Sequence, residues 1–493
     1  WIAPFISERD GIELYALYVL MFLNLISVYG LSRVWDSLSG VGARYFLVVP
    51  FVVACAFIVA IGFHPPMSTL YIRSTSTIFT QSLTVLIVII PTLMLLYYLQ
   101  QRWLRVALLA VFLLLIPVCF ISSDAIEWYD YSHILAPALR LLHGVNISEI
   151  YFQYDLLLSL MALAWMRLQL DLNAFQIVGQ LGFFILLVSV FVFSRRWFLD
   201  KRLSVFLLTV LVLVRIYVGP GEAIHAFQLT PYRLDMWFIL LVLVYFKGVH
   251  HWSAGIFCGL MLLLHKNFGI IYSAAYLQLL LTLSLMDAGP LLGKAFDRVK
   301  IVTKDFIKSN YHNFGFMLLG YLAQYLLFRN PNVQSNFNLV SLGVGFIKIA
   351  TTSFYWYVVV LVGLSFALLL KLRSNIPRNY LVTGLCLIYL TIGNSLYFFG
   401  RSHENNLINM SVILVMVLFL CLDMLGCYLS SAQGDFKKTF IHKNIAIIFS
   451  GLFITSITVW YGDSISLKAV TQVKNAINRQ FIYPSEIHKK NVK

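Results

Sequence analysis

Residues 174–193 read AFQIVGQLGFFILLVSVFVF, twenty residues without a charged side chain. At 1.5 Å per residue, an α-helix of this length crosses the roughly 30 Å of hydrocarbon in a bilayer. Similar apolar runs cover 81–99, 107–121 and 407–425. Only helices and closed barrels satisfy their backbone in hydrocarbon, and these runs lack the alternation of a barrel strand. The sequence therefore predicts an all-α polytopic membrane protein.

The composition agrees with this interpretation. Of 493 residues, 60% are hydrophobic and 12% are charged, whereas an ordinary soluble domain has roughly twice that charged fraction. The net charge of +15 lies mainly between the apolar runs, so we interpret it as a determinant of topology and expect membrane lipids, not nucleic acid, as partners. All six cysteines lie inside apolar runs without metal-ligand spacing, which predicts packing residues and no metal site.

We expect about fourteen spanning helices, and the apolar stretch 155–170 is a further candidate. The expected spans are 12–31, 44–63, 77–99, 103–122, 174–194, 204–219, 234–247, 252–265, 267–286, 313–329, 353–371, 379–398, 408–430 and 443–461. If 155–170 does not cross, the strongest basic loops all face the cytoplasm, as the positive-inside tendency requires. These loops are 195–202, 294–308, 371–378 and 437–438. We therefore predict that 155–170 lies along the outer face, which places 123–173, 218–233, 330–352 and 399–407 together on the non-cytoplasmic side.

The first of these outer segments is rich in groups that can move a proton. Asp124, Glu127, Asp130 and His133 stand within ten residues. A carboxylate beside hydrocarbon can act as a general base on a hydroxyl. The alternatives are an ordinary solvated acidic loop and, for Asp130, a helix N-cap. Residues 131–143 are amphipathic and end at Gly144, which predicts a helix lying in the membrane interface.

The other outer segments carry cationic and amide side chains. Arg233 opens a predicted span, and Lys266 interrupts an apolar stretch; snorkelling and a simple hairpin turn are the alternatives for these two residues. The segment 397–406 holds Arg401, His403 and Asn405, donors that suit a phosphate or a sugar. A solvated turn in which Glu404 pairs with the arginine is the alternative there.

Taken in order and sidedness, these segments resemble the GT-C superfamily, polytopic glycosyltransferases that use polyprenyl-phosphate-linked sugars. The resemblance covers about 104–430. The motifs in this range are similar to a pattern found in bacterial members of the superfamily. It rests on 129–133, Pro137, 142–144, Gln153-Tyr154, Pro231-Tyr232-Arg233, Lys266 to Gly269, and 400–403. The chain departs from the pattern in having four predicted spans before the acidic loop, no adjacent pair of acidic residues, and Asp155 in place of a glycine.

The resemblance implies a GT-C-like bundle with juxtamembrane amphipathic helices, acting as an inverting glycosyltransferase. A metal near the acidic loop is not supported by ligand spacing, so we predict no metal and no cofactor. Its partners would be a polyprenyl-phosphate-linked sugar donor and a glycan, lipid or protein acceptor. Asp130 would be the general base, with Asp124 and Glu127 as the other choices. The donor phosphate and substrate would be bound by Arg401, His403, Arg233, Lys266, His133, Tyr154 and Asn405.

The predicted organisation has four parts. Residues 1–103 are N-terminal spans, 104–330 the catalytic module, 331–462 the C-terminal spans, and 463–493 a basic tail. The expected location is a bacterial inner membrane, with the site facing the periplasm or exterior. Two other functions stay open from the sequence: a lipid-linked glycan polymerase or ligase, which also uses outer-loop arginines and histidines, and a secondary transporter.

Overall fold

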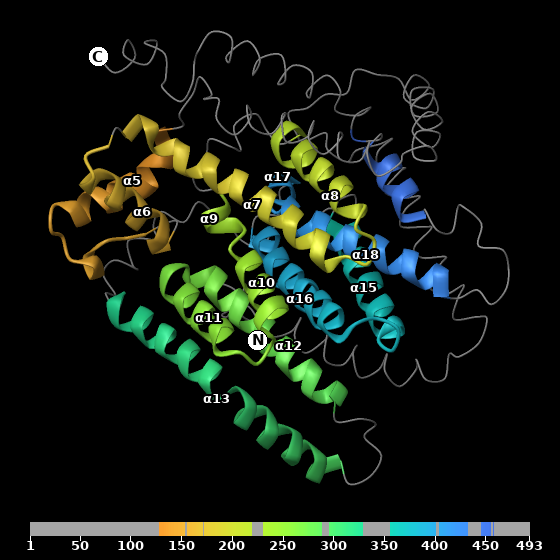
Figure 1. The fold of residues 1–493 in the computed structure, drawn as a ribbon. Helices are drawn as coiled ribbons and strands as arrows, with labels where there is room; N and C mark the ends of the chain where they lie inside the picture. The colour runs from red at the N-terminus through yellow and green to blue at the C-terminus, as the bar shows by residue number, and fades with distance from the viewer. Residues whose placement is uncertain are drawn as a thin grey trace, which may run out of the picture.

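The computed structural model describes nine stretches of the chain, and their regular elements are all helices (Figure 1). They are residues 128–152, 155–170, 172–218, 230–287, 295–328, 355–400, 404–431, 445–454 and 457. The predicted spans 12–31, 44–63, 77–99 and 103–122 lie outside the described residues. Within them, three helices are long and apolar enough to cross a membrane: Val178–Trp197, Lys266–Asp287 and Ser411–Leu429.

The helix bounds follow the apolar runs closely. The helices are α5 (Trp128–Leu142), α6 (Asp155–Arg167), α7 (Gln176–Trp197), α8 (Leu203–Val212), α9 (Pro231–Leu234), α10 (Trp237–Lys247), α11 (Trp252–Leu264), α12 (Lys266–Asp287), α13 (Ala295–Leu327), α15 (Tyr355–Leu372), α16 (Arg378–Gly400), α17 (Glu404–Asn409) and α18 (Ser411–Ser431). Short 3-10 turns cover Ile147–Glu149 and Leu172–Phe175, and a π-helical turn, Leu213–Val218, ends α8.

Two elements differ from the prediction. Helix α13 begins at Ala295, well before the predicted span 313–329, because its basic first part is helical without being apolar enough to suggest a crossing. The segment predicted as an outer loop, 399–407, instead contains the end of α16 and most of the short helix α17. Hydropathy identifies apolar length, whereas a polar helix at a membrane surface leaves little trace in it.

The core is one large apolar cluster that joins most of the long helices. Helix α18 is its centre, since Val417, Phe419 and Leu420 are 0% exposed. Three of the six cysteines, Cys258, Cys386 and Cys421, are buried as free thiols in this core, as predicted, and Cys427 is half-buried. Cys55 and Cys119 lie outside the described residues.

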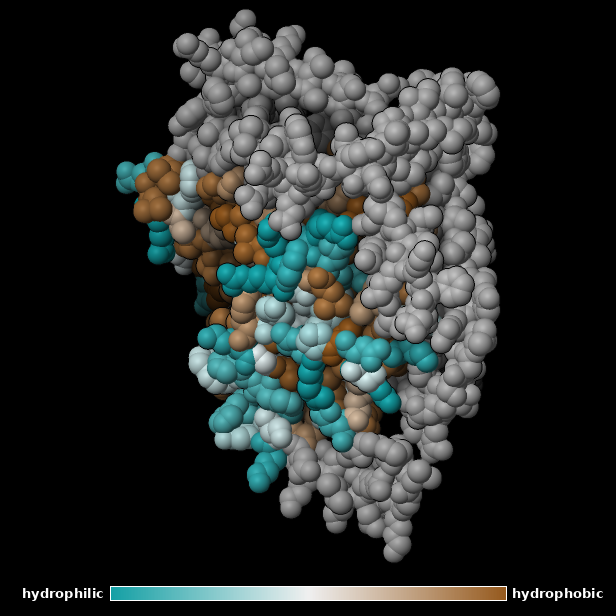
Figure 2. Space-filling model, turned by 45° about the vertical axis from the view of Figure 1, so that its right-hand side comes forward, coloured by the Kyte–Doolittle hydropathy of each residue, from teal (hydrophilic) through white to brown (hydrophobic). Residues whose placement is uncertain are grey.

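One end of the bundle is basic. The hydroxyl of Tyr245 donates to the backbone carbonyl of Arg196 (3.4 Å), and Arg378 pairs with Asp287. These contacts bring together the ends of α7, α10 and α12 and the start of α16. We call this the basic end; it carries Arg195, Arg196, Lys201, Arg202, Lys247, Arg373 and Arg378. Figure 2, in which the right-hand side of Figure 1 comes forward, shows hydrophilic residues that form a patch beside hydrophobic ones.

The opposite ends of the same helices also gather, and we call this the loop end. Arg215, at the end of α8, donates to the carbonyl of Ile408 in α17 (3.1 Å), and Tyr355, at the start of α15, hydrogen-bonds to Ser395 near the end of α16. The rings of Phe152 and Phe328 lie 5.7 Å apart, so α13 ends beside the segment between α5 and α6. The described residues in or beside all four predicted outer segments therefore lie at one end of the bundle.

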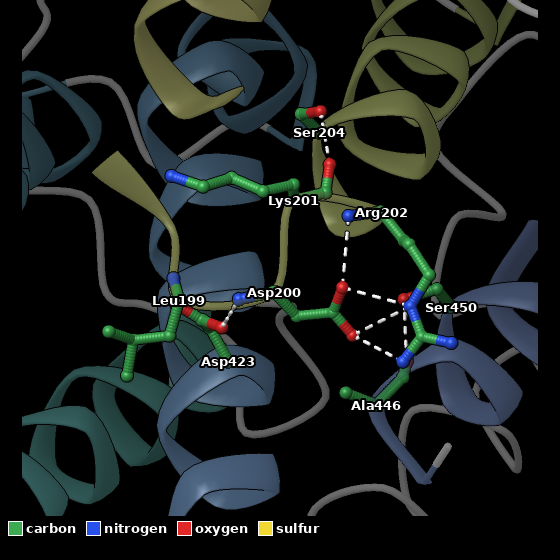
Figure 3. A network of polar contacts seen from close by, with 8 residues as sticks. All are labelled: Leu199, Asp200, Lys201, Arg202, Ser204, Asp423, Ala446 and Ser450. Carbon is green, nitrogen blue, oxygen red and sulfur yellow. Dashed lines mark hydrogen bonds and ion pairs between the residues drawn. The ribbon is translucent and has the colours of Figure 1, made fainter. Parts of the chain in front are cut away.

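A buried carboxylate closes the basic end (Figure 3). Asp423, in α18, accepts hydrogen bonds from the backbone N–H groups of Leu199 (2.8 Å) and Asp200 (2.9 Å) in the turn between α7 and α8, and from the hydroxyl of Tyr380 (2.8 Å). Asp200 in turn forms an ion pair with Arg202 (2.8 Å). One side chain thus fixes the turn between two helices and the start of a third.

This network predicts a large effect of substitution at Asp423. Asp423→Ala leaves two backbone donors and a phenol without their acceptor, so we expect a loss of about 2 to 4 kcal/mol in the free energy of unfolding. Thermal or denaturant unfolding of the purified protein in detergent measures it. The matched control is Asp287→Ala, which removes an exposed ion pair and should cost about 1 kcal/mol or less. Equal losses in the two variants would contradict the assigned role of Asp423.

Candidate functional site

The first outer segment folds as a hairpin of two helices, α5 and α6. The amphipathic pattern predicted for 131–143 is confirmed: Ile134 and Ala138 are 0% exposed, whereas Arg140 and His143 are exposed. Gly144 ends the helix with a φ of +81°, the left-handed conformation that favours glycine after a helix C-terminus. His133 is half-buried on α5.

The described part of α5 (Trp128–Leu142) includes the backbone of Asp130. The alternative in which Asp130 caps the helix from outside is therefore wrong, because an N-cap residue precedes the first helical residue. The other two carboxylates of the acidic loop, Asp124 and Glu127, lie outside the described residues, as does Tyr154.

A small apolar cluster connects this hairpin to α9. It contains Ile134 and Ala138 of α5, Leu158 of α6 and Phe175 beside α7, and the half-buried Tyr232 packs against it. Helix α6 has 13 residues, a length of about 20 Å. It contacts α5, α9 and α11. That 155–170 lies along the outer face of a membrane without crossing it stays a prediction.

Helix α9 is a single turn that carries Arg233. It starts after the buried Thr230 with Pro231 at its first position, where a missing N–H costs nothing. The ring of Tyr232 lies against Gly182 of α7, and burial raises the pKa of Tyr232, so its hydroxyl stays protonated near neutral pH. Arg233 is half-buried. The helix is interrupted at Asp235, and α10 begins at Trp237, three residues after the predicted start of the span.

Arg215 is a buried charged group of the loop end with partners on several helices. It lies in the π-helical turn and is 1% exposed. Its guanidinium donates to the carbonyl of Ile408 (3.1 Å) and to Oδ1 of Asn409 (3.5 Å), and its Cζ lies 5.1 Å from the centre of the Phe183 ring. Single π-helical turns occur frequently at functional sites. The arginine therefore joins α7, α8 and α17.

Asp235 supplies the opposite charge. It is 3% exposed and lies close enough to Arg215 for their charges to attract. The indole N–H of Trp237 donates to its Oδ1 (3.3 Å), whereas Oδ2 has no hydrogen bond within the described part of the chain. A buried carboxylate with an unfilled acceptor depends on a nearby cation for its stability. The attraction between Asp235 and Arg215 thus connects α9 and α10 with α17.

Lys266 lies at the loop end, in a hairpin. Helix α11 ends at Leu264, His265 is 0% exposed, and Lys266 begins α12 and is half-buried. A Cβ added at Gly269 would overlap the backbone of Met261 and Leu262, so only glycine lets the two helices approach this closely. The hairpin turn considered for Lys266 is confirmed. Gly269, three residues after Lys266, is explained by the close packing of α11 against α12.

Helix α17 carries the backbone of Asn405 into the same region. Asn406 and Asn409 are buried, with exposures of 9% and 6%. Arg401 and His403 lie outside the described residues, although the segment that holds them joins α16 to α17. The structure therefore places Arg233, Lys266 and the backbones of Asp130 and Asn405 at one end of the bundle.

Sequence reasoning missed Arg215 and Asp235, since both fall inside the predicted spans 204–219 and 234–247. A signal was nevertheless visible, because Arg215 is the single charged residue within its predicted span, Asp235 is the single acidic residue within its own, and burying a charge in hydrocarbon is costly. Such a residue needs a partner. No group of three His, Cys, Asp or Glu side chains that could hold a metal ion occurs among the described residues.

Comparison with known proteins adds no relative. No family model matches the chain, and no curated protein or solved structure matches it. The chemistry of the loop end is therefore argued from its own residues. It combines half-buried cations with hydroxyl and amide groups beside apolar helices, which suits an anionic ligand that carries a hydrocarbon chain.

The hairpin predicts a position-specific effect of added bulk. Gly269→Ala forces α11 and α12 apart, so we expect a loss of about 1 to 3 kcal/mol in the free energy of unfolding. Gly315→Ala is the matched control, because nothing lies within 4 Å of a Cβ at this helical position. Alanine there should leave stability unchanged or slightly raised. Unfolding midpoints in detergent compare the two, and a neutral Gly269→Ala would contradict the close approach.

Proposed function

We propose that this protein is an inverting glycosyltransferase of the membrane that moves a sugar from a polyprenyl-phosphate carrier to an extracytoplasmic acceptor. The proposal includes a GT-C-like bundle of about fourteen spans in a bacterial inner membrane, with the loop end facing the periplasm or exterior. The single observation that supports it most is that the described residues in or beside the predicted outer segments lie at one end of the bundle, opposite the basic end.

The charge distribution supports a lipid-linked anion as the donor. Arg233 and Lys266 stand at the ends of apolar helices at the loop end, where a phosphate on a hydrocarbon chain could approach from the bilayer. Cations at this position would stabilise the negative charge that the departing lipid phosphate gains in the transition state. Arg401 and His403 would add to them, with His133, Tyr154 and Asn405 as further substrate contacts.

The proton would be taken by a carboxylate of the first outer segment. In the proposed reaction Asp130 accepts the proton of the acceptor hydroxyl. The oxygen of that hydroxyl attacks the anomeric carbon of the donor sugar from the face opposite the phosphate. The bond between the anomeric carbon and the phosphate oxygen breaks, and the lipid phosphate leaves with its electron pair. Asp124 and Glu127 are the other candidates for this base. The position of α5 beside α6, and of α6 beside α9, supports a base near Arg233.

The proposal predicts the behaviour of the protein in reconstituted vesicles. Given a polyprenyl-phosphate monosaccharide with a radiolabelled sugar, the protein should transfer one sugar per acceptor. Growth of a long chain would instead favour a glycan polymerase, and accumulation of free labelled sugar inside the vesicles would favour a transporter. Neither product would leave the glycosyltransferase proposal standing.

A substitution identifies the base. Asp130→Asn keeps the shape of the side chain but removes its basicity, so we expect a loss of transfer of about a hundredfold or more, since general bases contribute 10²–10⁴-fold. Asp124→Asn and Glu127→Gln are the matched comparisons. The melting temperature of each variant controls for folding. Full activity of Asp130→Asn, with loss in one of the other two, would move the catalytic role to that residue.

A further inference from the structure

The contacts of Arg215 extend beyond what a buried charge requires. Neutralising Asp235 needs only proximity, yet the guanidinium also donates to the Ile408 carbonyl and reaches Asn409. Both acceptors belong to the last turn of α17, whose carbonyls have no partner within the helix itself. An arginine that donates to such a carbonyl fixes the helix end in place and is favoured there by the helix dipole.

Helix α17 needs this support, because it has only six residues. A helix this short is not stable alone. Its residues Asn406 and Leu407 are nevertheless buried. The backbone N–H of Met410 donates to the carbonyl of Asn406 (3.2 Å), which continues α17 toward α18 but does not connect it to another part of the bundle. The contacts with Arg215 do make that connection.

We infer that Arg215 is a positioning residue: it holds α17 against the α9 side of the loop end. The functional part of this inference rests on the proposed function, in which Arg401 and His403 bind the donor phosphate. Arg215 itself is 1% exposed and acts through α17. Its hydrogen bonds to Ile408 and Asn409 join the predicted catalytic module to the C-terminal helices, whereas its attraction to Asp235 lies within that module.

The two tasks of Arg215 can be separated by mutation. Arg215→Met alone leaves Asp235 buried without a countercharge, a change that commonly prevents folding. The double variant Arg215→Met with Asp235→Asn removes both charges and should recover folded protein. It still lacks the donors to Ile408 and Asn409. The double variant therefore tests the position of α17 without an uncompensated charge.

Cysteine labelling measures that position without any assay of activity. Leu407→Cys is made in a chain whose six native cysteines are replaced by alanine, and the protein in lipid nanodiscs is treated with a charged maleimide. Leu407 is 5% exposed, so labelling should be slow. In the double variant we expect labelling to be at least tenfold faster. The single variant Arg215→Lys, with Asp235 unchanged, keeps the charge and one donor. In this variant labelling at position 407 should stay nearly as slow as in the parent chain.

Leu420→Cys is the matched control, because Leu420 is 0% exposed and lies near the middle of α18, away from the end that adjoins α17. Its labelling should stay slow in every variant. An unchanged rate at 407 in the double variant would overturn the inference. Equal acceleration at 407 and 420 would also overturn it, because the effect would then be a general loosening of the bundle.

Kinetics of sugar transfer test the functional part. We expect the double variant to raise the KM for the polyprenyl-phosphate donor at least fivefold and to change kcat less, because the displaced groups bind the donor. Loss of kcat at an unchanged KM would overturn this part. If the parent protein transfers no sugar while the labelling result holds, the proposed function fails and the positioning of α17 by Arg215 stands.

Discussion

A guanidinium inside an apolar helix end must find partners or the helix will not remain in place, and Arg215 finds them on three other elements. It lies against the ring of Phe183, donates to the end of α17, and attracts the carboxylate of Asp235. These partners lie far apart in the sequence, so the charge can be satisfied only when α7, α8, α17 and the junction of α9 with α10 have assembled. Removing the guanidinium of Arg215 from water costs free energy unless these partners are in place. The chain therefore folds stably only when the loop end has this arrangement.

The basic end is organised by the same principle with the opposite sign. There Asp423 is the buried charge, and its partners are backbone N–H groups and a phenol. The two charges lie toward opposite ends of the bundle, since α18 starts at the loop end and carries Asp423 a little past its midpoint toward the other end. The apolar core between them is nondirectional, and it permits helices to slide or rotate. Buried hydrogen-bonded charges at both ends restrict that freedom.

The sequence predicted the apolar helices better than it predicted the site. Apolar length is a local property, so α7, α12, α15 and α16 begin and end within a few residues of the predicted spans. The positive-inside tendency predicted which side of a membrane the basic turns face, and this sidedness stays a prediction. Arg215 and Asp235 were missed because a lone charge indicates that a partner exists but not which one. Ile408 and Asn409 lie more than 190 residues from Arg215.

Gly269 and Asp130 also show the difference between a local sequence pattern and the three-dimensional structure that explains it. The spacing of Lys266 and Gly269 was visible in the sequence, but its reason is a three-dimensional contact between the backbones of α11 and α12. Asp130 was interpreted as a loop residue beside a helix, whereas the helix already includes it. The backbone of Asp130 therefore has the regular geometry of a helix, which the polarity of the segment did not reveal.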